Sequence, residues 1–350
     1  MARYEALGMA LEESVRKVSE GKRVGIAFSG GMDSGLLAAL ASKYAKSVTC
    51  YTCGTDDSFD VAAGKELAEK LGLPWVHCRI CKENIEDDIR ELILATGVSD
   101  PFTISYELQL FTVCREATER VVLSGQGSDE YFGGCASSVN DDDSEYTTFT
   151  DWGIERMMKV SQPCELAIAS HFKKQLRYPY LDEHVIECVN QIDPEELRPR
   201  SLEERKSVLK TVVTDLGFPI LAHRTKKASQ YGSGTTELIR DTAKAKGMRY
   251  NGYIASIYES LGLRNANLLR DSALDVRMDP ILVHDSKIVL EKLGLTDSEA
   301  IATFYKKMVK EGLPEDVEKD DEDAVQKLTD TYTKKIDELL AAKEKEIMTV

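Results

Sequence analysis

Apolar and polar positions form two kinds of pattern along the first 135 residues. Short runs rich in apolar and β-branched residues predict a buried strand at 23–28 and further strands at 47–54, 75–81 and 120–125. Amphipathic stretches between these runs predict helices at 3–19, 34–45, 58–73, 84–96 and 105–118. Strands that alternate with helices form parallel sheets with both faces covered. Right-handed crossovers then give a doubly wound α/β fold, whose ligand site lies beyond the carboxyl ends of the strands.

The pattern changes after residue 135. Residues 135–151 are polar and predict a loop, and helical patterns dominate from 152 to about 216. The chain is therefore expected to contain an α/β domain at 1–135 followed by helical and α-rich segments at 136–270, 271–314 and 315–350.

Charge and composition narrow the class of protein. The net charge of −15 disfavours broad nucleic-acid binding and favours small-molecule partners. No run of about 20 apolar residues predicts a membrane span, and the charged N-terminus does not resemble a signal peptide. Eight cysteines without such a signal indicate reduced thiols, so we expect a cytoplasmic protein.

A glycine turn joins the first predicted strand to the next helix in the segment SGGMDS. Gly30 and Gly31 can turn successive N–H groups toward one anion, and the following helix adds its positive N-terminal end. Ser29 and Ser34 supply hydroxyl groups, whereas Asp33 would repel a bare phosphate. The pattern therefore predicts a phosphate site with a bridging Mg²⁺, distinct from the Walker loop, which needs a lysine after its last glycine.

Four segments in order carry a family resemblance. SGGMDS resembles the SGGxDS loop of the PP-loop ATP pyrophosphatases. The segments at 121–134, 177–199 and 206–234 resemble the LSGEGSDExFGG, R-x-P-[FY]-L-D and K-x-x-L-[RK]…R-x-K segments of asparagine synthetases. The resemblance covers about residues 20–240 and is greatest to short, archaeal-type relatives that lack the glutaminase domain. It implies an adenine nucleotide α-hydrolase-like sheet at 1–135 and a helical part of the synthetase domain at 136–270.

The resemblance also implies site residues. It places the pyrophosphate of ATP on Ser29, Gly30, Gly31, Asp33 and Ser34, and Mg²⁺ on Asp33 and Asp129. The nucleotide would contact Thr52, Cys53, Gly54, Ser58, Asp60, Gly125 and Gln126. Lys206 and Lys226 match two family lysines, which with Asp129 would be catalytic, because adenylation develops negative charge on the departing pyrophosphate.

The chemistry that the resemblance implies is an ATP-dependent carbon–nitrogen ligation. The β-carboxylate of aspartate attacks the α-phosphorus of ATP, which gives an acyl-adenylate and pyrophosphate, and ammonia then displaces AMP. Residue 2 is Ala and the predicted sheet begins at 23, so we expect ammonia to come from solution or from a separate glutaminase. Gln126 stands where the family has Glu, and a neutral amide cannot act as a base, so another amine acceptor stays open.

Two CxxC pairs, at 50–53 and 78–81, leave an RNA-modifying PP-loop enzyme with a metal or cluster as an alternative. Both pairs fall in predicted strands, where residues three apart point to opposite faces. We therefore expect buried, reduced cysteines rather than a metal site. No basic RNA-binding extension accompanies them.

The C-terminal segments carry two further resemblances. Residues 273–314 resemble the ribbon-helix-helix part of RelB/DinJ-type antitoxins, which implies a homodimer formed through 273–279 and leaves DNA binding as an alternative function beside an inactive synthetase domain. Asp275 would repel phosphate there, which disfavours DNA as a partner. Residues 323–350 resemble the last helix of ribosome recycling factors, and by themselves predict a charged amphipathic helix.

Overall fold

Five parallel strands form one sheet in the part of the chain that the structure, a computed structural model, describes: residues 3–135, 143–224 and 229–263. The strands are β1 (Arg23–Ala27), β2 (Ser47–Gly54), β3 (Trp75–Arg79), β4 (Val121–Leu123) and β5 (Gln175–Arg177). Their order in the sheet is β3-β2-β1-β4-β5. The predicted doubly wound α/β fold is confirmed.

The strand order reverses between β1 and β4. Ile26 of β1 pairs with Cys50 of β2 on one side and with Leu123 of β4 on the other. The chain runs outward from β1 through β2 to β3 and then returns to β4, so the loops that follow β1 and β4 diverge at their carboxyl ends. This topological switch point is where open α/β sheets bind ligands.

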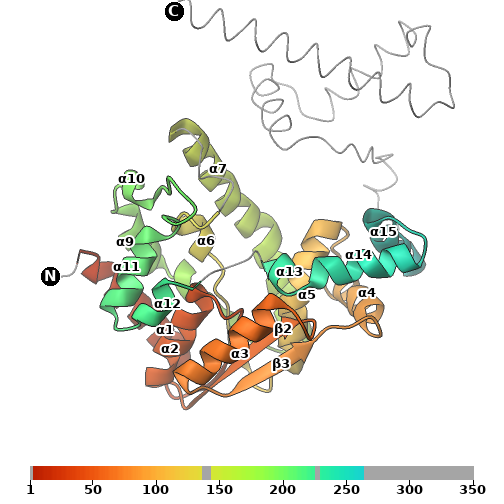
Figure 1. Ribbon diagram of the computed structural model, residues 1–350, viewed down its shortest axis with the longest axis horizontal. Helices are drawn as coiled ribbons and strands as arrows, with labels where there is room; N and C mark the ends of the chain where they lie inside the picture. Colours follow the sequence, from red (N-terminus) through yellow and green to blue (C-terminus); the bar gives the residue numbers. More distant parts are fainter. Residues whose placement is uncertain (1–2, 136–142, 225–228, 264–350) are drawn as a thin grey trace, which may run out of the picture. The chain divides into compact units, whose positions relative to one another are not determined.

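Helices cover both faces of the sheet. On one face lie α1 (Glu5–Ser19), α2 (Met32–Tyr44) and α3 (Phe59–Leu71), with α9 (Glu183–Asn190), α11 (Ser207–Asp215) and α12 (Pro219–Ala222) outside them. On the other face lie α4 (Ile85–Thr96), α5 (Pro101–Glu116), α8 (Gln162–His171), α14 (Thr235–Ala245) and α15 (Tyr250–Ser260). Figure 1 shows the two groups on opposite sides of the strands.

The cysteines of the sheet follow its alternation. Cys50 lies in the core that contains α1 and α2, whereas Cys53 lies in the opposite core with Cys78, its partner in the β2–β3 register. Burial raises the pKa of both Cys50 and Cys53 to about 12, so these thiols stay protonated at neutral pH. The two cysteines of the 50–53 pair therefore face different cores and cannot bind one metal ion together.

The helical part of the chain differs from the prediction in two places. Residues 143–151, predicted as loop, belong to α7 (Asp143–Arg156), so this part of the prediction is wrong. The polar sequence of this segment carries no clear helical pattern of apolar residues, and α7 packs on α6 (Ser128–Tyr131). It continues through a π-helix (Met157–Ser161) into α8. The second difference is β5, a three-residue edge strand in which only Leu176 is buried.

The remaining short elements are α10 (Pro194–Leu197), α13 (Ser229–Gly232) and a 3₁₀ turn (Pro179–Leu181). Among the described helices, none has the length and apolar content that crossing a membrane requires. The chain divides into two units, Met1–Arg270 and Asp271–Val350. The second unit lies outside the described residues, so the predictions for 273–314 and 323–350 have no structural counterpart here.

Candidate functional site

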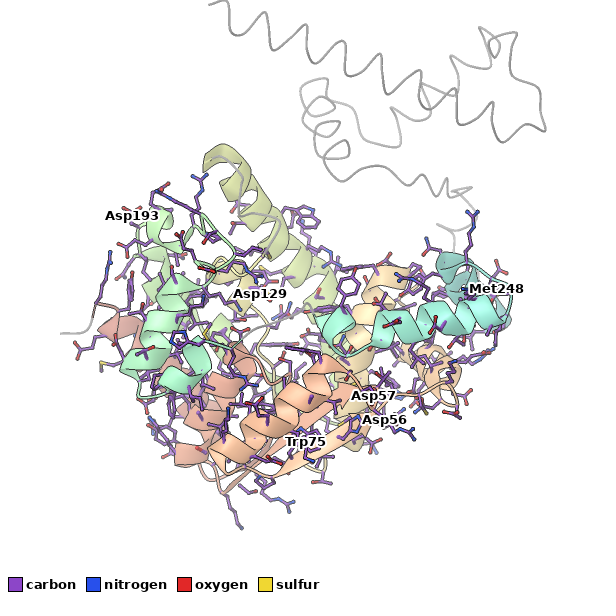
Figure 2. The ribbon with its side chains drawn as sticks, in the orientation of Figure 1. Asp56, Asp57, Trp75, Asp129, Asp193 and Met248 are labelled. Atoms are coloured by element: carbon purple, nitrogen blue, oxygen red, sulfur yellow. The ribbon has the colours of Figure 1, made fainter. Side chains whose placement is uncertain are left out.

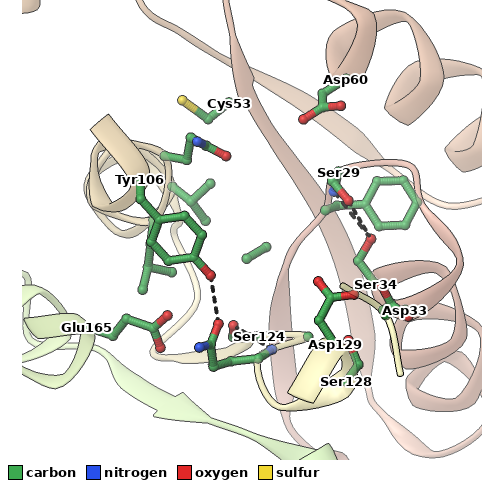
Figure 3. A pocket seen from close by; sticks show the side chains of 18 of the residues that line it. Ser29, Asp33, Ser34, Cys53, Asp60, Tyr106, Ser124, Ser128, Asp129 and Glu165 are labelled. Atoms are coloured by element: carbon green, nitrogen blue, oxygen red, sulfur yellow. Dashed lines mark hydrogen bonds between the residues drawn. The ribbon is translucent and has the colours of Figure 1, made fainter. Parts of the chain in front are cut away.

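A cavity of about 700 Å³ opens where the carboxyl ends of β1, β2 and β4 meet (Figure 3). The predicted residues that line it are Ser29, Asp33, Ser34, Thr52, Cys53, Asp60, Gly125, Gln126 and Asp129. Of the other predicted residues, Lys206 contacts the carboxylates of this wall, and Gly30, Gly31, Gly54 and Ser58 are not among the lining residues. Lys226 lies outside the described residues.

The glycine loop is held tightly against α3. Gly30 has φ +73°, and a Cβ there would lie 2.4 Å from the carbonyl carbon of Ala63 and the nitrogen of Gly64. Arg224 joins the two segments, since its Nε donates to the oxygen of Gly30 at 2.7 Å and its Nη2 donates to the oxygen of Ala63 at 3.1 Å. Only glycine combines this conformation with this close approach.

The polar groups of the loop make long hydrogen bonds with one another. The N–H of Ser29 donates to Oγ of Ser34 at 3.3 Å, and the N–H of Gly31 donates to Oγ of Ser29 at 3.4 Å. The two serine hydroxyls lie 3.4 Å apart. Such bonds are weak, so an incoming anion can replace them, and the N-terminus of α2 adds its positive end at the same place.

Lys206 brings two predicted magnesium ligands together. Its Nζ lies 2.7 Å from Oδ1 of Asp33 and 2.7 Å from Oδ1 of Asp129. It also donates to Oγ of Ser128 at 3.1 Å, and the residue is only 5% exposed. Gly134 makes room for this side chain, because a Cβ there would lie 2.4 Å from Cε of Lys206.

The donor set around Lys206 suits a magnesium ion. Asp33 and Asp129 converge on one positive charge, and Mg²⁺ in proteins commonly takes one or two carboxylates together with water and substrate phosphates. Both residues line the cavity beside the glycine loop. These two side chains are the ones that could hold the ion.

Tyr180 supports the loop from behind. It is fully buried in the 3₁₀ turn, and its hydroxyl donates to the backbone oxygen of Asp33 at 3.0 Å. Its ring packs edge-on against Phe132 with the centroids 6.1 Å apart. The segment around residue 180 therefore positions the loop and does not itself line the cavity.

Near β2, one side-chain hydroxyl group is hydrogen-bonded and another has no hydrogen-bond partner among the described residues. Thr52 donates to the oxygen of Phe28 at 2.6 Å and accepts from Nε1 of Trp75 at 2.9 Å, so its hydroxyl already has both partners. Ser58 Oγ is buried and has no hydrogen-bond partner in the described part of the chain. A Cβ on Gly54 would lie 2.4 Å from that oxygen, so Gly54 opens this wall.

The opposite end of the cavity contains residues that no motif predicted. Tyr106, Glu107 and Gln109 come from α5, and Glu165 comes from α8. The hydroxyl of Tyr106 donates to Oε1 of Gln126 at 2.9 Å (Figure 3). The available signal was a single acid in an otherwise apolar helical stretch, as in ISYELQLF and PCELAIA.

Burial raises the pKa of both acids at this end. The pKa of Glu165 rises to about 8, with a nearby Glu130 adding to the effect of burial. The pKa of Glu107 rises well above its ordinary value because of burial and the charge of Glu165. The cavity thus has a carboxylate pair neutralised by Lys206 at one end and a proton-binding pair at the other.

Comparison with known proteins agrees with the sequence motifs. Residues 6–163 match the asparagine synthase family. The predicted resemblance to asparagine synthetases is thereby confirmed. Residues 298–348 match the ribosome recycling factor family, a longer segment than the predicted 323–350, and the ribbon-helix-helix resemblance of 273–314 stays a prediction.

Individual relatives cover much of the chain. It is 31% identical over 283 residues to "Putative asparagine synthetase (glutamine-hydrolyzing) 1" of Methanocaldococcus jannaschii. The aligned region covers 69% of this chain and 52% of the relative. It is 28% identical to the glutamine-hydrolyzing asparagine synthetase of Brassica oleracea, over 62% of this chain and 40% of the relative. The chain thus spans about half the length of these relatives, or less.

One solved structure is distantly similar. NMN synthetase from Francisella tularensis has a TM-score of 0.36 and 15% sequence identity, over 79% of this chain and 97% of that one. A similarity this low says nothing about the ligand or reaction.

Proposed function

We propose that this chain is an ATP-dependent, amide-forming ligase of the asparagine synthetase type. It would activate a carboxylate, the β-carboxylate of aspartate, as an acyl-adenylate with release of pyrophosphate, and then amidate it with ammonia. The observation that carries the proposal is the meeting of the glycine loop, Asp129 and Lys206 at the switch point of the sheet, in one cavity.

The glycine loop and its surroundings would bind the pyrophosphate of ATP. Ser29, Ser34 and the N-terminus of α2 offer exchangeable donors at the wall of the cavity. Asp33 and Asp129 would hold Mg²⁺, which when bound neutralises phosphate charge and makes pyrophosphate a better leaving group. Lys206, and Lys226 by its family match, would add positive charge where pyrophosphate departs.

The adenosine would lie along the wall of β2. Cys53 lines the cavity there, and behind it Gly54 leaves room for the buried hydroxyl of Ser58, which lacks a described partner. Thr52 would contribute through its backbone, because its hydroxyl is engaged. Gly125 approaches the loop from β4, where a Cβ would lie 3.5 Å from Cβ of Asp33. Asp60 is 4% exposed and completes this wall.

The second half-reaction would take ammonia, free or delivered by a separate glutaminase. Gln126 lies at the cavity wall and accepts a hydrogen bond from Tyr106, so it can orient a group but cannot remove a proton. The reaction would take place in the cytoplasm, and a homodimer through 273–279 stays part of the proposal.

The test is aspartate-dependent exchange of labelled pyrophosphate into ATP. Wild type should exchange label when Mg²⁺ and L-aspartate are present, and Asp33→Asn should abolish exchange. Asp193→Asn is the matched control, because Asp193 is exposed at the start of α10 and lies away from Asp129 (Figure 2). If wild type binds ATP but exchanges no label with aspartate, the proposed reaction is wrong for this substrate. Loss of exchange in both variants would contradict a specific role for Asp33 in the reaction.

A further inference from the structure

The end of the cavity remote from the glycine loop contains two buried acids. Glu107 is 1% exposed and Glu165 is 3% exposed, and both line the cavity. Figure 3 shows Glu165 beside Tyr106, across the open space from Ser29 and Asp33. Both acids therefore border the cavity, and their unpaired oxygens are themselves buried.

The two acids lack hydrogen bonds that a buried carboxyl needs. Both side-chain oxygens of Glu107 and Oε2 of Glu165 have no partner within the described residues. Nε2 of Gln109 is likewise without a described partner, and the hydroxyl of Tyr178 interacts with Glu165 and favours its charged form. A buried polar group left unpaired costs about 1–3 kcal/mol, and more when charged. Buried polar groups without partners are typical of binding sites, where a ligand supplies the missing hydrogen bonds.

The charged residues near Glu107 and Glu165 act on the pKa values of the two acids in opposite directions. Arg156 on α7 favours the charged form of Glu107, whereas Glu130 on α6 opposes charge on Glu165. Burial raises the pKa of each acid, and the charge of Glu165 adds to the effect on Glu107, so the pair tends to keep protons at neutral pH. A ligand group that is compact, positively charged and rich in hydrogen-bond donors would therefore suit this end of the cavity.

We propose that Glu107 and Glu165 bind a primary ammonium group of a ligand in this cavity. An ammonium group carries three donors on a compact charge, which matches the three unpaired carboxyl oxygens. The inference rests on the proposed ligase function, in which such a group has two sources. It belongs either to the α-ammonium of the amino-acid substrate or to the ammonium ion that delivers the amide nitrogen.

Binding would exchange one positive charge for another. The carboxyls keep protons before binding; the ammonium takes the place of a proton beside them, and that proton leaves to solvent. Ammonium binding near neutral pH should therefore be accompanied by net proton release.

The experiment is isothermal titration of the full chain at pH 7 in two buffers of different ionisation enthalpy, without ATP. The titrants are L-aspartate, ammonium chloride, and succinate, which is aspartate without its amine. The variants are Glu107→Gln and Glu165→Gln, which keep the shape and remove a buried charge. Glu91→Gln is the matched control, because Glu91 is 44% exposed and pairs with His171 on the outside of α4.

Wild type and Glu91→Gln should bind an amine with net proton release, and both pocket variants should bind it at least tenfold more weakly with less release. Release with L-aspartate assigns the site to the amino-acid substrate, and release with ammonium alone assigns it to the nitrogen donor. Succinate should bind without release. Unchanged amine affinity in the variants, or no amine binding to wild type, would overturn the inference. The separate pyrophosphate exchange assay shows whether the ligase function itself has failed.

Discussion

The ammonium nitrogen of Lys206 lies 2.7 Å from Oδ1 of Asp33, although 173 positions separate the two residues in the sequence. The same nitrogen lies 2.7 Å from Oδ1 of Asp129. One buried cation thus joins the glycine loop, the turn after β4 and the start of α11. It balances two acids that would otherwise repel each other at the edge of the sheet.

In Lys206→Met, the repulsion between the carboxylates of Asp33 and Asp129 should no longer be compensated. We expect the free energy of unfolding to fall by about 3 kcal/mol, because a buried pair that loses one partner leaves uncompensated charge. Added Mg²⁺ should restore part of the loss if Asp33 and Asp129 bind the ion. Urea unfolding with and without MgCl₂ measures both effects. Lys244→Met, on the exposed side of α14, should change neither value. A variant that Mg²⁺ does not stabilise would argue against a metal site here.

A comparison of Gly30→Ala with Gly72→Ala distinguishes the effect of a steric clash with α3 from the effect of the left-handed backbone conformation. Gly72 has nearly the same conformation, φ +66° against +73°, but a Cβ at Gly72 would meet nothing within 4 Å. Gly72→Ala should therefore cost only the left-handed strain, about 1–2 kcal/mol. Gly30→Ala should cost clearly more and abolish pyrophosphate exchange, because its methyl group would overlap the backbone of Ala63. Equal losses in urea unfolding would mean that the loop can move away from α3.

Tyr180→Phe tests the support behind the loop. The hydroxyl of Tyr180 donates to the backbone oxygen of Asp33 from a fully buried position, and the ring contact with Phe132 would survive. We expect a loss of about 1 kcal/mol in the free energy of unfolding, the usual net value of one hydrogen bond. Tyr258→Phe on α15 should stay within about 0.5 kcal/mol of wild type. No loss in Tyr180→Phe would show that the bond contributes nothing to the loop.

The acid pair predicts a pH dependence of stability. Burial raises the pKa of Glu165 from 4.5 to about 8, so the folded chain keeps a proton that the unfolded chain releases. Its contribution to stability is complete below about pH 4.5 and is lost as the pH rises to about 8. Glu165→Gln cannot titrate, so its free energy of unfolding should fall less than that of wild type over this range. Urea unfolding between these two pH values measures the difference, and Glu91→Gln should follow the wild-type slope.

The sequence predicted the sheet well where burial was continuous. The runs that became β1, β2 and β4 are largely buried, and the predicted helices agree with α1 to α5 within a few residues. It did not predict β5, because three residues with one buried side chain carry no periodic signal. The polar composition of 143–151 likewise hid α7, whose packing on α6 depends on distant parts of the chain.

The candidate site was predictable only in its local motifs. Ser29, Asp33, Gly125 and Asp129 stand in glycine turns with a recognisable order, and the structure brings them to one cavity. The engaged hydroxyl of Thr52 could not be foreseen, since its partners Phe28 and Trp75 are set by strand register. Glu107 and Glu165 were missed for a similar reason: a single acid in an apolar helix becomes informative only when its neighbours in space are known.

The ties that hold the glycine loop also set an order of events during synthesis. Both Lys206 and Arg224 follow the loop by long intervals, 173 residues to Asp33 and 194 residues to Gly30. A ribosome that adds ~5–20 residues per second would need roughly 9 to 39 seconds to add these intervals. During that time Lys206 does not yet balance the acid of the loop, and Arg224 does not yet join the loop to α3. Native closure of this wall of the cavity must therefore follow the synthesis of Arg224.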